Sequence, residues 1–175
     1  MSTTSITSYS AQEQLRNGRR IAIRALKPQD RTGLSTAVGR ASSQTLYRRF
    51  FGAKRHFSKR EVEFFTNVDF INHVALVAES DEAGRPAIIG GGRFVVVEPG
   101  KAELAFTVVD QYQGQGIATL LMRHLGAIAR EAGLRELVAE VLPENASMLK
   151  VFEHSGFPSK VSRERGVVRV TLRLC

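Results

Sequence analysis

The hydrophobic positions change their period several times along the chain. A period of two at the start predicts a strand, a period near that of a helix follows, and the period of two returns over residues 73–109. From residue 116 onward, a helical pattern, a short strand, a second helix and a closing hairpin follow in order. The expected elements are a strand at residues 19–26, helices at 28–40, 42–51 and 58–67, strands at 73–80, 87–98 and 101–109, a helix at 116–133, a strand at 137–142, a helix at 143–154 and a hairpin at 161–174.

Short-range signals mark where several of these elements begin and end. Pro28 and Asp30 suit a first helical turn, because proline loses no hydrogen bond there and an acidic side chain favours the positive end of the helix dipole. Ser58 and Glu61 have the spacing of a capping box, which predicts that a helix begins after Ser58. Gly156 follows the last helical pattern and is expected to end that helix.

The strands over residues 73–109 are expected to form an antiparallel meander, because turn sequences separate them at residues 81–84 and at Pro99-Gly100. Three consecutive glycines, residues 90–92, lie inside the middle strand. Glycine inside a strand is typical of a bulge or of close packing against a neighbour. We favour that interpretation over a ligand-binding loop.

Length and composition fit one folded domain. The 175 residues are 43% hydrophobic and 24% charged, which is ordinary for a globular protein with a buried core. Residues 1–17 are polar, and we expect a flexible leader there, followed by one domain over residues 18–175. We expect a cytoplasmic protein, because residues 1–10 lack the apolar core of a signal peptide, no apolar run reaches the roughly 20 residues of a membrane span, and Cys175 is the only cysteine.

The formal net charge of +8 raises the question of an acidic partner. The Lys and Arg residues are scattered, however, without the basic helix or aromatic platform that is typical of a nucleic-acid reader. We therefore expect neither a nucleic acid nor a membrane as partner, and we interpret most of this charge as solvated surface. Attraction of a polyphosphate cofactor or of an acidic partner stays open.

Gly114 and Gly116 stand between the strand that ends near Val109 and the helix that follows it. At a helix start, unpaired N–H groups and the helix dipole favour an anion, and glycine lets a ligand approach the backbone closely. A dinucleotide-binding loop also begins with G-x-G, but this loop follows an antiparallel meander and too little chain remains for further parallel units. A Walker A loop is excluded, because no Lys-Ser/Thr pair follows the second glycine.

Two segments resemble signatures of the GNAT family of acyl-CoA N-acyltransferases. Residues 111–118, with the pattern Gln-x-x-Gly-x-Gly-Ile-Ala, are similar to its acetyl-CoA loop, and residues 145–157, from Asn to Gly-Phe, are similar to its later motif. The resemblance covers about residues 19–175. It implies an α/β (α+β mixed) GNAT fold, in which a mixed, mostly antiparallel twisted sheet of about six to seven strands, flanked by helices, splits like a V to hold acetyl-CoA.

The resemblance also implies where acetyl-CoA, the expected cosubstrate, would bind. Its pyrophosphate would lie on the backbone of the glycine loop, and its pantetheine would take main-chain groups of Val108 and Val109. The implied cofactor-binding residues are Val108, Val109, Gln113, Gly114, Gln115, Gly116, Ile117, Ala118, Thr119, Asn145 and Phe152. Simpler interpretations stay open for some of them, since the two valines also suit a strand core and Asn145 also suits a helix N-cap.

Glu103 is the candidate catalytic residue. An amine such as lysine, with an unperturbed pKa of about 10.4, is protonated at neutral pH and needs a proton acceptor before it attacks a thioester. Strand alternation puts Glu103 on one face with Ala105 and Thr107, where partial burial would raise its pKa toward the range of a general base. In the GNAT protein acetyltransferases that the chain resembles, a glutamate at this position is the general base. The alternative for Glu103 is a surface ion pair with Lys101.

The chain departs from the family pattern at Phe152, where many members have a tyrosine that protonates the leaving thiolate. Phenylalanine cannot donate a proton, so water or the departing ammonium proton would have to serve. His124 lies within an apolar helical pattern and is interpreted as structural. His56, His73 and His154 lack the spacing of metal ligands, and no metal site is predicted.

The expected acceptor is a protein lysine. Residues 46–51, Leu-Tyr-Arg-Arg-Phe-Phe, resemble the front of the GNAT domain in bacterial protein lysine acetyltransferases that modify acyl-CoA synthetases. A small amine, such as a polyamine, an aminoglycoside or an amino-acid-like amine, is the first alternative. A non-catalytic acyl-CoA sensor is the alternative from another class.

Overall fold

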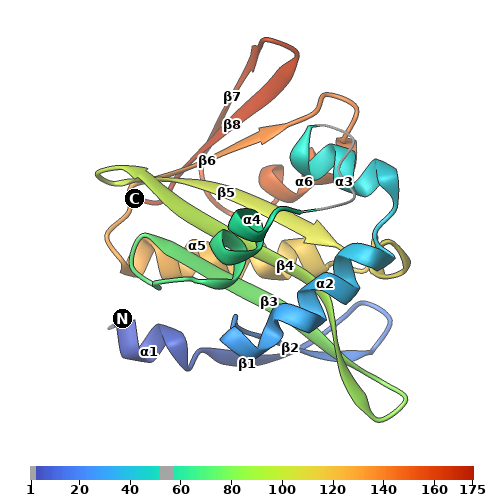
Figure 1. Cartoon of the computed structure of the whole chain (residues 1–175). Helices are drawn as coiled ribbons and strands as arrows, with labels where there is room; N and C mark the ends of the chain where they lie inside the picture. The colour runs from blue at the N-terminus through green and yellow to red at the C-terminus, as the bar shows by residue number, and fades with distance from the viewer. Residues whose placement is uncertain (1–2, 52–56) are drawn as a thin grey trace.

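The computed structural model describes residues 3–51 and 57–175, and Figure 1 shows their arrangement. One eight-stranded sheet crosses this part of the chain in the order β1-β2-β3-β4-β5-β6-β8-β7. Neighbouring strands are antiparallel except β5 and β6, which are parallel. The strands are β1 (Ser10–Gln14), β2 (Arg20–Ala25), β3 (His73–Glu82), β4 (Arg85–Glu98), β5 (Lys101–Val108), β6 (Glu136–Val141), β7 (Ser159–Glu164) and β8 (Val167–Arg173).

Helices cover both faces of this sheet. In Figure 1, α2 and α4 lie in front of the sheet and α5 lies behind it. The α-helices of the described residues are α1 (Thr3–Thr7), α2 (Arg31–Arg40), α3 (Ser43–Phe50), α4 (Lys59–Thr66), α5 (Ile117–Glu131) and α6 (Ala146–Glu153), and the 3-10 turns are η1 (Pro28–Asp30) and η2 (Asp110–Tyr112).

The expected order of elements is confirmed from residue 19 onward, and so is the mixed, mostly antiparallel sheet. The sheet has eight strands instead of six or seven, because β1 pairs with the outer edge of β2. The flexible leader expected over residues 1–17 is therefore wrong for the described part of that segment, which contains α1 and β1. With the sequence Ser-Ala-Gln-Glu-Gln, β1 has almost no hydrophobic alternation to predict it, and its main-chain pairing with β2 holds it in the sheet.

Alternate residues of β3 contribute to two separate apolar layers. Val74, Leu76 and Ala78 belong to the large core, which includes most of the buried residues of α5. Ala75 and Val77 belong to a smaller cluster on the opposite face, where Leu34 and Ala37 of α2 pack. This period-two division explains why β3 is hydrophobic on both sides, since both faces of the central sheet are covered.

Four polar side chains tie the N-terminal segment to α5. The Tyr9 hydroxyl hydrogen-bonds His124 Nδ1, and His124 Nε2 lies 2.7 Å from Glu13 Oε1. Arg123 adds an ion pair of 2.6 Å to the same carboxylate. Burial opposes ionisation of Glu13, but the hydrogen bonds from Arg123 and His124 outweigh it and lower the pKa of this carboxyl. These contacts agree with a structural role for His124 and fix the hairpin of β1 and β2 against the helix.

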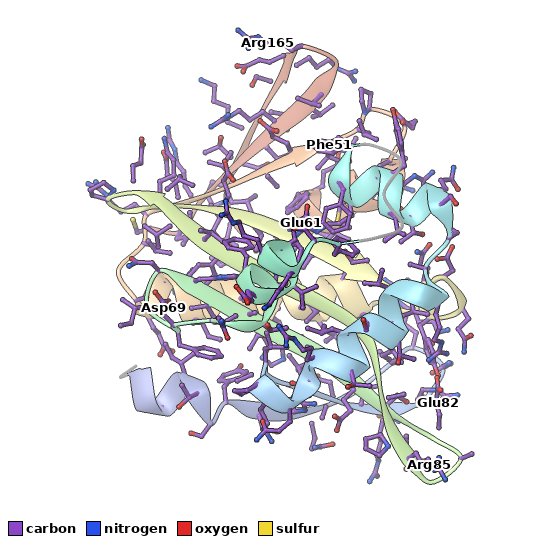
Figure 2. The ribbon with its side chains drawn as sticks, viewed as in Figure 1. Phe51, Glu61, Asp69, Glu82, Arg85 and Arg165 are labelled. Carbon is purple, nitrogen blue, oxygen red and sulfur yellow. The ribbon has the colours of Figure 1, made fainter. Side chains whose placement is uncertain are left out.

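Short-range hydrogen bonds and turns mark the ends of several elements. The Ser58 Oγ accepts a hydrogen bond from Glu61 N–H at 3.1 Å and the Glu61 carboxylate accepts one from Ser58 N–H at 2.7 Å, which is the expected capping box. The Asp69 carboxylate accepts from three successive N–H groups, residues 71–73, as the chain turns into β3; Glu61 and Asp69 are labelled in Figure 2. Arg165 stands at the tip of the β7–β8 hairpin, where it and Gly166 both have positive φ.

The glycine triplet of β4 combines a bulge with close packing, as its sequence predicted. The register of β3 and β4 shifts opposite Ala78, next to Gly90. A Cβ atom on Gly92 would come within 2.5 Å of the Phe106 ring and 2.9 Å of Leu125. The missing side chain at Gly92 therefore lets α5 pack closely against the sheet.

We predict that Gly92→Ala lowers the free energy of unfolding by about 1–3 kcal/mol, the usual cost of overpacking a filled core. Gly39→Ala in α2 is the matched control, because a Cβ there meets no atom within 4 Å. It should leave stability unchanged or raise it by up to about 1 kcal/mol through helix propensity. Urea unfolding of both variants measures the difference, and equal stability of the two would contradict the packing argument.

Candidate functional site

The parallel strands β5 and β6 are paired over only three residues. Their pairing ends at Glu103 and Val138, and the two strands separate beyond that point. A cavity of about 540 Å³ lies in the opening, with residues 104–108 of β5 on one wall and residues 139–141 of β6 on the other. The sheet therefore has the V-shaped split that was expected.

The cavity brings together most of the residues that were predicted to bind the cosubstrate. Its lining includes nine of them: Val108, Gln113, Gly114, Gly116, Ile117, Ala118, Thr119, Asn145 and Phe152. The predicted residues Val109, Gln115 and Glu103 are not part of the lining. The site is thus formed by the end of β5, the glycine loop, the start of α5 and the helix α6.

The main chain of β5 presents hydrogen-bonding groups to this opening. The N–H of Val109 donates to Ile89 O of β4 at 2.9 Å, and its carbonyl accepts from Tyr112 N–H, so both main-chain groups already have a partner within the protein. Binding of a ligand by Val109 stays a prediction. Main-chain groups of successive strand residues alternate between the two edges of the strand. Those of Leu104, Phe106 and Val108 consequently face β6 across the split, where no strand partner remains. Strand alternation was the signal that could have identified Leu104 and Phe106.

The loop after β5 leaves its N–H groups free. Gly116 is the N-cap of α5, with φ of 96°, and provides no side chain to cap the helix. Gly114 has φ of 76°, a left-handed conformation that favours glycine. Among the residues described, no main-chain acceptor bonds the N–H groups of residues 114–119. An uncapped helix start with free N–H groups is a binding site for an anion such as a pyrophosphate.

Gln113 holds the loop in place through its side chain. Its Nε2 donates to Val108 O at 3.0 Å and to Thr45 Oγ1 of α3 at 3.1 Å. Gln115 is bonded on the outside of the loop, where its Oε1 accepts from Asn17 Nδ2 at 3.2 Å. These bonds connect the loop to β5, to α3 and to the turn between β1 and β2.

The α6 wall contains the two predicted residues of the second motif. Asn145 is the N-cap of α6, and its Oδ1 accepts from Met148 N–H at 3.4 Å; its amide nitrogen donates to no described residue. The N-cap interpretation is therefore confirmed, and the amide nitrogen stays available to the cavity. Phe152 is buried and packs on Phe106 at 6.0 Å between ring centroids. The position expected to hold a tyrosine thus contributes an apolar wall.

Two carboxylates lie beside the split on one face of the sheet. Glu103 takes part in the last β5–β6 pair and is exposed, so the partial burial that we expected for it is wrong. The alternative ion pair with Lys101 is absent from the described residues, where Lys101 pairs with Glu98 at 2.8 Å and Glu136 at 3.6 Å. Glu140 lines the cavity from β6, two residues after the partner of Glu103. Alternation along β6 was the signal for Glu140, which the sequence analysis did not select.

Neither a metal cluster nor a membrane span was found. Within residues 3–51 and 57–175, no group of three or more His, Cys, Asp or Glu side chains could hold a metal ion. In the same ranges, no helix has both the length and the apolar character that crossing a bilayer requires.

Comparison with known proteins identifies the family. A model of the Acetyltransferase (GNAT) family matches residues 40–157. The acetyltransferase PA5475 of Pseudomonas aeruginosa is 33% identical over 137 residues, which cover 78% of this chain and 74% of that protein. The crystal structure of the GNAT domain of S. lividans PAT is 35% identical with a TM-score of 0.85, over 94% of this chain and 96% of that one. This chain belongs to the GNAT acetyltransferase family.

Two further proteins are similar to this chain. The acetyltransferase Pat of Mycolicibacterium smegmatis is 33% identical over 145 residues, 82% of this chain, but the chain spans only 43% of that protein. The structure of yncA from Salmonella typhimurium, solved with acetyl-CoA, has the same fold at 17% identity, with a TM-score of 0.71 over 89% of this chain and 94% of that one. As a GNAT enzyme, the protein transfers an acetyl group from its cosubstrate acetyl-CoA to an amine. The predicted family, activity and cosubstrate are confirmed.

One cavity residue lies outside the GNAT match and was missed by the sequence analysis. Arg16 lines the cavity from the turn between β1 and β2, and its Nε lies 3.7 Å from the position of a Cβ on Gly116. The Tyr9–His124–Glu13 contacts hold this turn beside the start of α5. A guanidinium next to free N–H groups adds positive charge where GNAT enzymes receive phosphates.

We predict that Arg16→Gln raises KM for acetyl-CoA about fivefold, which is the effect of losing one exposed ion pair. KM for acetyl-pantetheine, which lacks the phosphates, should stay the same. Arg20→Gln is the matched control, because Arg20 is exposed on the same hairpin and is not part of the cavity lining. Steady-state kinetics with acetyl-CoA and with acetyl-pantetheine measure both KM values. An equal rise in KM for the two donors would contradict a contact between Arg16 and a phosphate.

Proposed function

We propose that this GNAT enzyme acetylates the side chain of a protein lysine, with Glu103 as the general base. The observation that carries the proposal is the position of Glu103 at the vertex of the split, where β5 and β6 cease to pair. A thioester carbonyl held by the main chain of β5 lies in reach of an amine that enters over this face. The similarity to PAT and Pat supports the resemblance to protein lysine acetyltransferases.

The register of the sheet defines which face the acceptor approaches. Arg93 of β4 is paired with Ala105 of β5 and contacts Phe65 of α4, so the face with Ala105 and Glu103 is the one that α3 and α4 cover. Leu104 and Phe106 point the other way, into the core beneath α5. The acceptor amine is therefore expected on the side of α3 and α4.

The surface beside this opening is suited to a protein partner. Four large hydrophobic side chains are exposed on the segment that contains α3, α4 and the turn into β3: Tyr47, Phe51, Phe64 and Ile71. Figure 2 shows Phe51 at the end of α3. Large exposed apolar side chains are typical of a protein-binding surface, whereas a small amine would not need them.

The reaction needs one proton acceptor and one leaving group. Glu103 removes a proton from the lysine ammonium, directly or through one water, and the freed amine attacks the acetyl carbonyl. The carbon–sulfur bond then breaks, the electron pair of that bond leaves on the CoA sulfur, and the positively charged nitrogen of the adduct loses its second proton to solvent to give the neutral amide. A thiol has a pKa of about 8.5, so its thiolate is a weak base that departs without a general acid. Phe152 in place of tyrosine is compatible with this chemistry, and solvent returns the proton to CoA.

We predict that Glu103→Gln lowers kcat/KM for acetylation of a protein lysine by about 100-fold or more, as expected for a lost general base. Glu140→Gln is the matched control, because Glu140 lies on the facing strand and lines the same cavity. It should retain activity within a fewfold of the parent. CoA release, together with mass-spectrometric detection of acetyl-lysine, measures both variants on acyl-CoA synthetases, lysine peptides, polyamines and aminoglycosides.

The two variants separate the possible bases. If kcat/KM fell strongly in Glu140→Gln and only slightly in Glu103→Gln, the general base would be Glu140 of β6. That result would overturn the assignment of Glu103. If polyamines or aminoglycosides were acetylated and no protein or peptide was, the acceptor would be a small amine instead of a protein lysine. Isothermal titration with acetyl-CoA is needed alongside, so that a loss of rate is not mistaken for a loss of cosubstrate binding.

A further inference from the structure

Two half-buried arginine side chains lie close together at α3. Arg49 comes from α3 and Arg93 from the middle of β4. Burial lowers the pKa of Arg93 to about 9, and the positive charge of Arg49 contributes to that shift. Burial also lowers the pKa of Arg49 to about 10. Two like charges that are removed from water destabilise each other unless an anion accompanies them.

The protein supplies no anion for this pair. Arg93 Nη1 donates to Phe65 O at 3.1 Å and to His73 Nε2 at 2.9 Å, and its guanidinium lies 4.8 Å from the centroid of the Phe65 ring. Arg49 lies over the Phe50 ring at 4.7 Å. Burial, with Arg93 as a further cause, lowers the pKa of His73 to about 4, so this partner is neutral.

Neither arginine is paired with a carboxylate in the part of the chain that the structure describes. No ion pair joins Arg49 or Arg93 to an Asp or Glu in residues 3–51 and 57–175, and the remaining residues, 1–2 and 52–56, include no acidic side chain. The adjacent Arg48 has a buried Nε that lacks a hydrogen-bond partner within the described ranges. The cluster therefore has donors in excess and no acceptor of matching charge.

The position of the pair connects it to the reaction site. Arg48 and Arg49 line the cavity, and Arg93 is paired in register with Ala105, which lines it as well. Thr45, one helical turn before Arg49, bonds Gln113 beside the glycine loop. Along β5, Arg93 thus lies between the phosphate end of the cavity and Glu103, on the face where the acceptor amine is expected.

We infer that Arg49 and Arg93 bind a carboxylate of the acceptor protein, so that the enzyme selects lysines with an acidic side chain nearby. The inference rests on the proposed acetylation of a protein lysine. Guanidinium groups bind carboxylates through paired, charge-assisted hydrogen bonds, and partial burial strengthens such bonds. The Arg pair would fix the acceptor at one point while the lysine beside it reaches the thioester.

The test is a double-mutant cycle between enzyme and peptide. Lysine peptides carry one glutamate that is moved along the sequence one position at a time, and each has a glutamine counterpart. For the best position, we expect the glutamate peptide to have a kcat/KM about 10-fold or more above its counterpart, the effect of one charge-assisted hydrogen bond. Arg49→Gln should remove this preference, so that kcat/KM for the glutamate peptide falls to the value for its glutamine counterpart measured with the same variant. If Arg49 had only a structural role, the substitution would lower kcat/KM for the glutamate peptide and for the glutamine peptide by the same factor.

Further variants keep the test decisive. Arg49→Lys retains the charge without the planar donor and should keep part of the preference, whereas the exposed Arg60→Gln on α4 should keep all of it. Arg93→Gln is measured as well, provided that its thermal melting shows a folded protein. Acetylation of glutamate and glutamine peptides at equal rates by the parent enzyme would overturn the inference and leave the proposed function intact.

Two other outcomes also have defined meanings. If Arg49→Gln loses turnover with a dicarboxylic acyl-CoA, such as succinyl-CoA, but keeps the peptide preference, the anion belongs to the acyl donor and the inference is overturned. If no lysine in any peptide or protein is acetylated while polyamines or aminoglycosides are, the proposed function itself fails, and the inference fails with it.

Discussion

The short pairing of β5 with β6 is the constraint on which the rest of the site depends. Only the vertex of the split is joined by main-chain hydrogen bonds, so the inner edge of β5 carries donors and acceptors without a strand partner. Unsatisfied main-chain groups are unfavourable when they are enclosed. An extended ligand with its own amides, such as pantetheine, can replace the missing strand. The same separation makes room for the glycine loop, for α6 and for an amine that approaches over α3.

Positive charge in this protein is divided between two kinds of setting. Around the glycine loop it comes from main-chain N–H groups and from a solvent-exposed arginine, both of which remain hydrated until a ligand arrives. At α3 it comes from half-buried side chains, each of which lies over an aromatic ring. The first setting suits a highly charged, mobile group, and the second suits a single fixed carboxylate.

Features that depend on residues close together in sequence could be predicted. The capping box of α4, the turn at Arg165-Gly166 and the left-handed glycines of the loop each follow from neighbouring residues whose geometry is short-range. The two GNAT motifs predict where the cosubstrate binds, because their spacing is characteristic. Nine of the eleven implied binding residues lie along one cavity for this reason.

Features that depend on register or on distant contacts could not be predicted. The burial of Glu103 was wrong because exposure depends on what covers the sheet at the vertex, which alternation alone does not specify. Arg93 looks like an ordinary polar position of a strand, and only its pairing with Ala105 and the packing of α4 show that it is enclosed. Arg16 belongs to a segment without periodicity, and its place beside Gly116 results from contacts more than 100 residues apart in the chain.

The strand β1 also has a protective effect on the sheet as a whole. It covers one edge of β2 with a mainly polar strand, whereas β2 alternates buried isoleucines with half-buried residues. A chain shortened to begin at Gly18 would leave the main-chain groups of β2 open to a strand from a second molecule. The first residues of this protein therefore guard against self-association, in addition to bringing a cation to the cosubstrate loop.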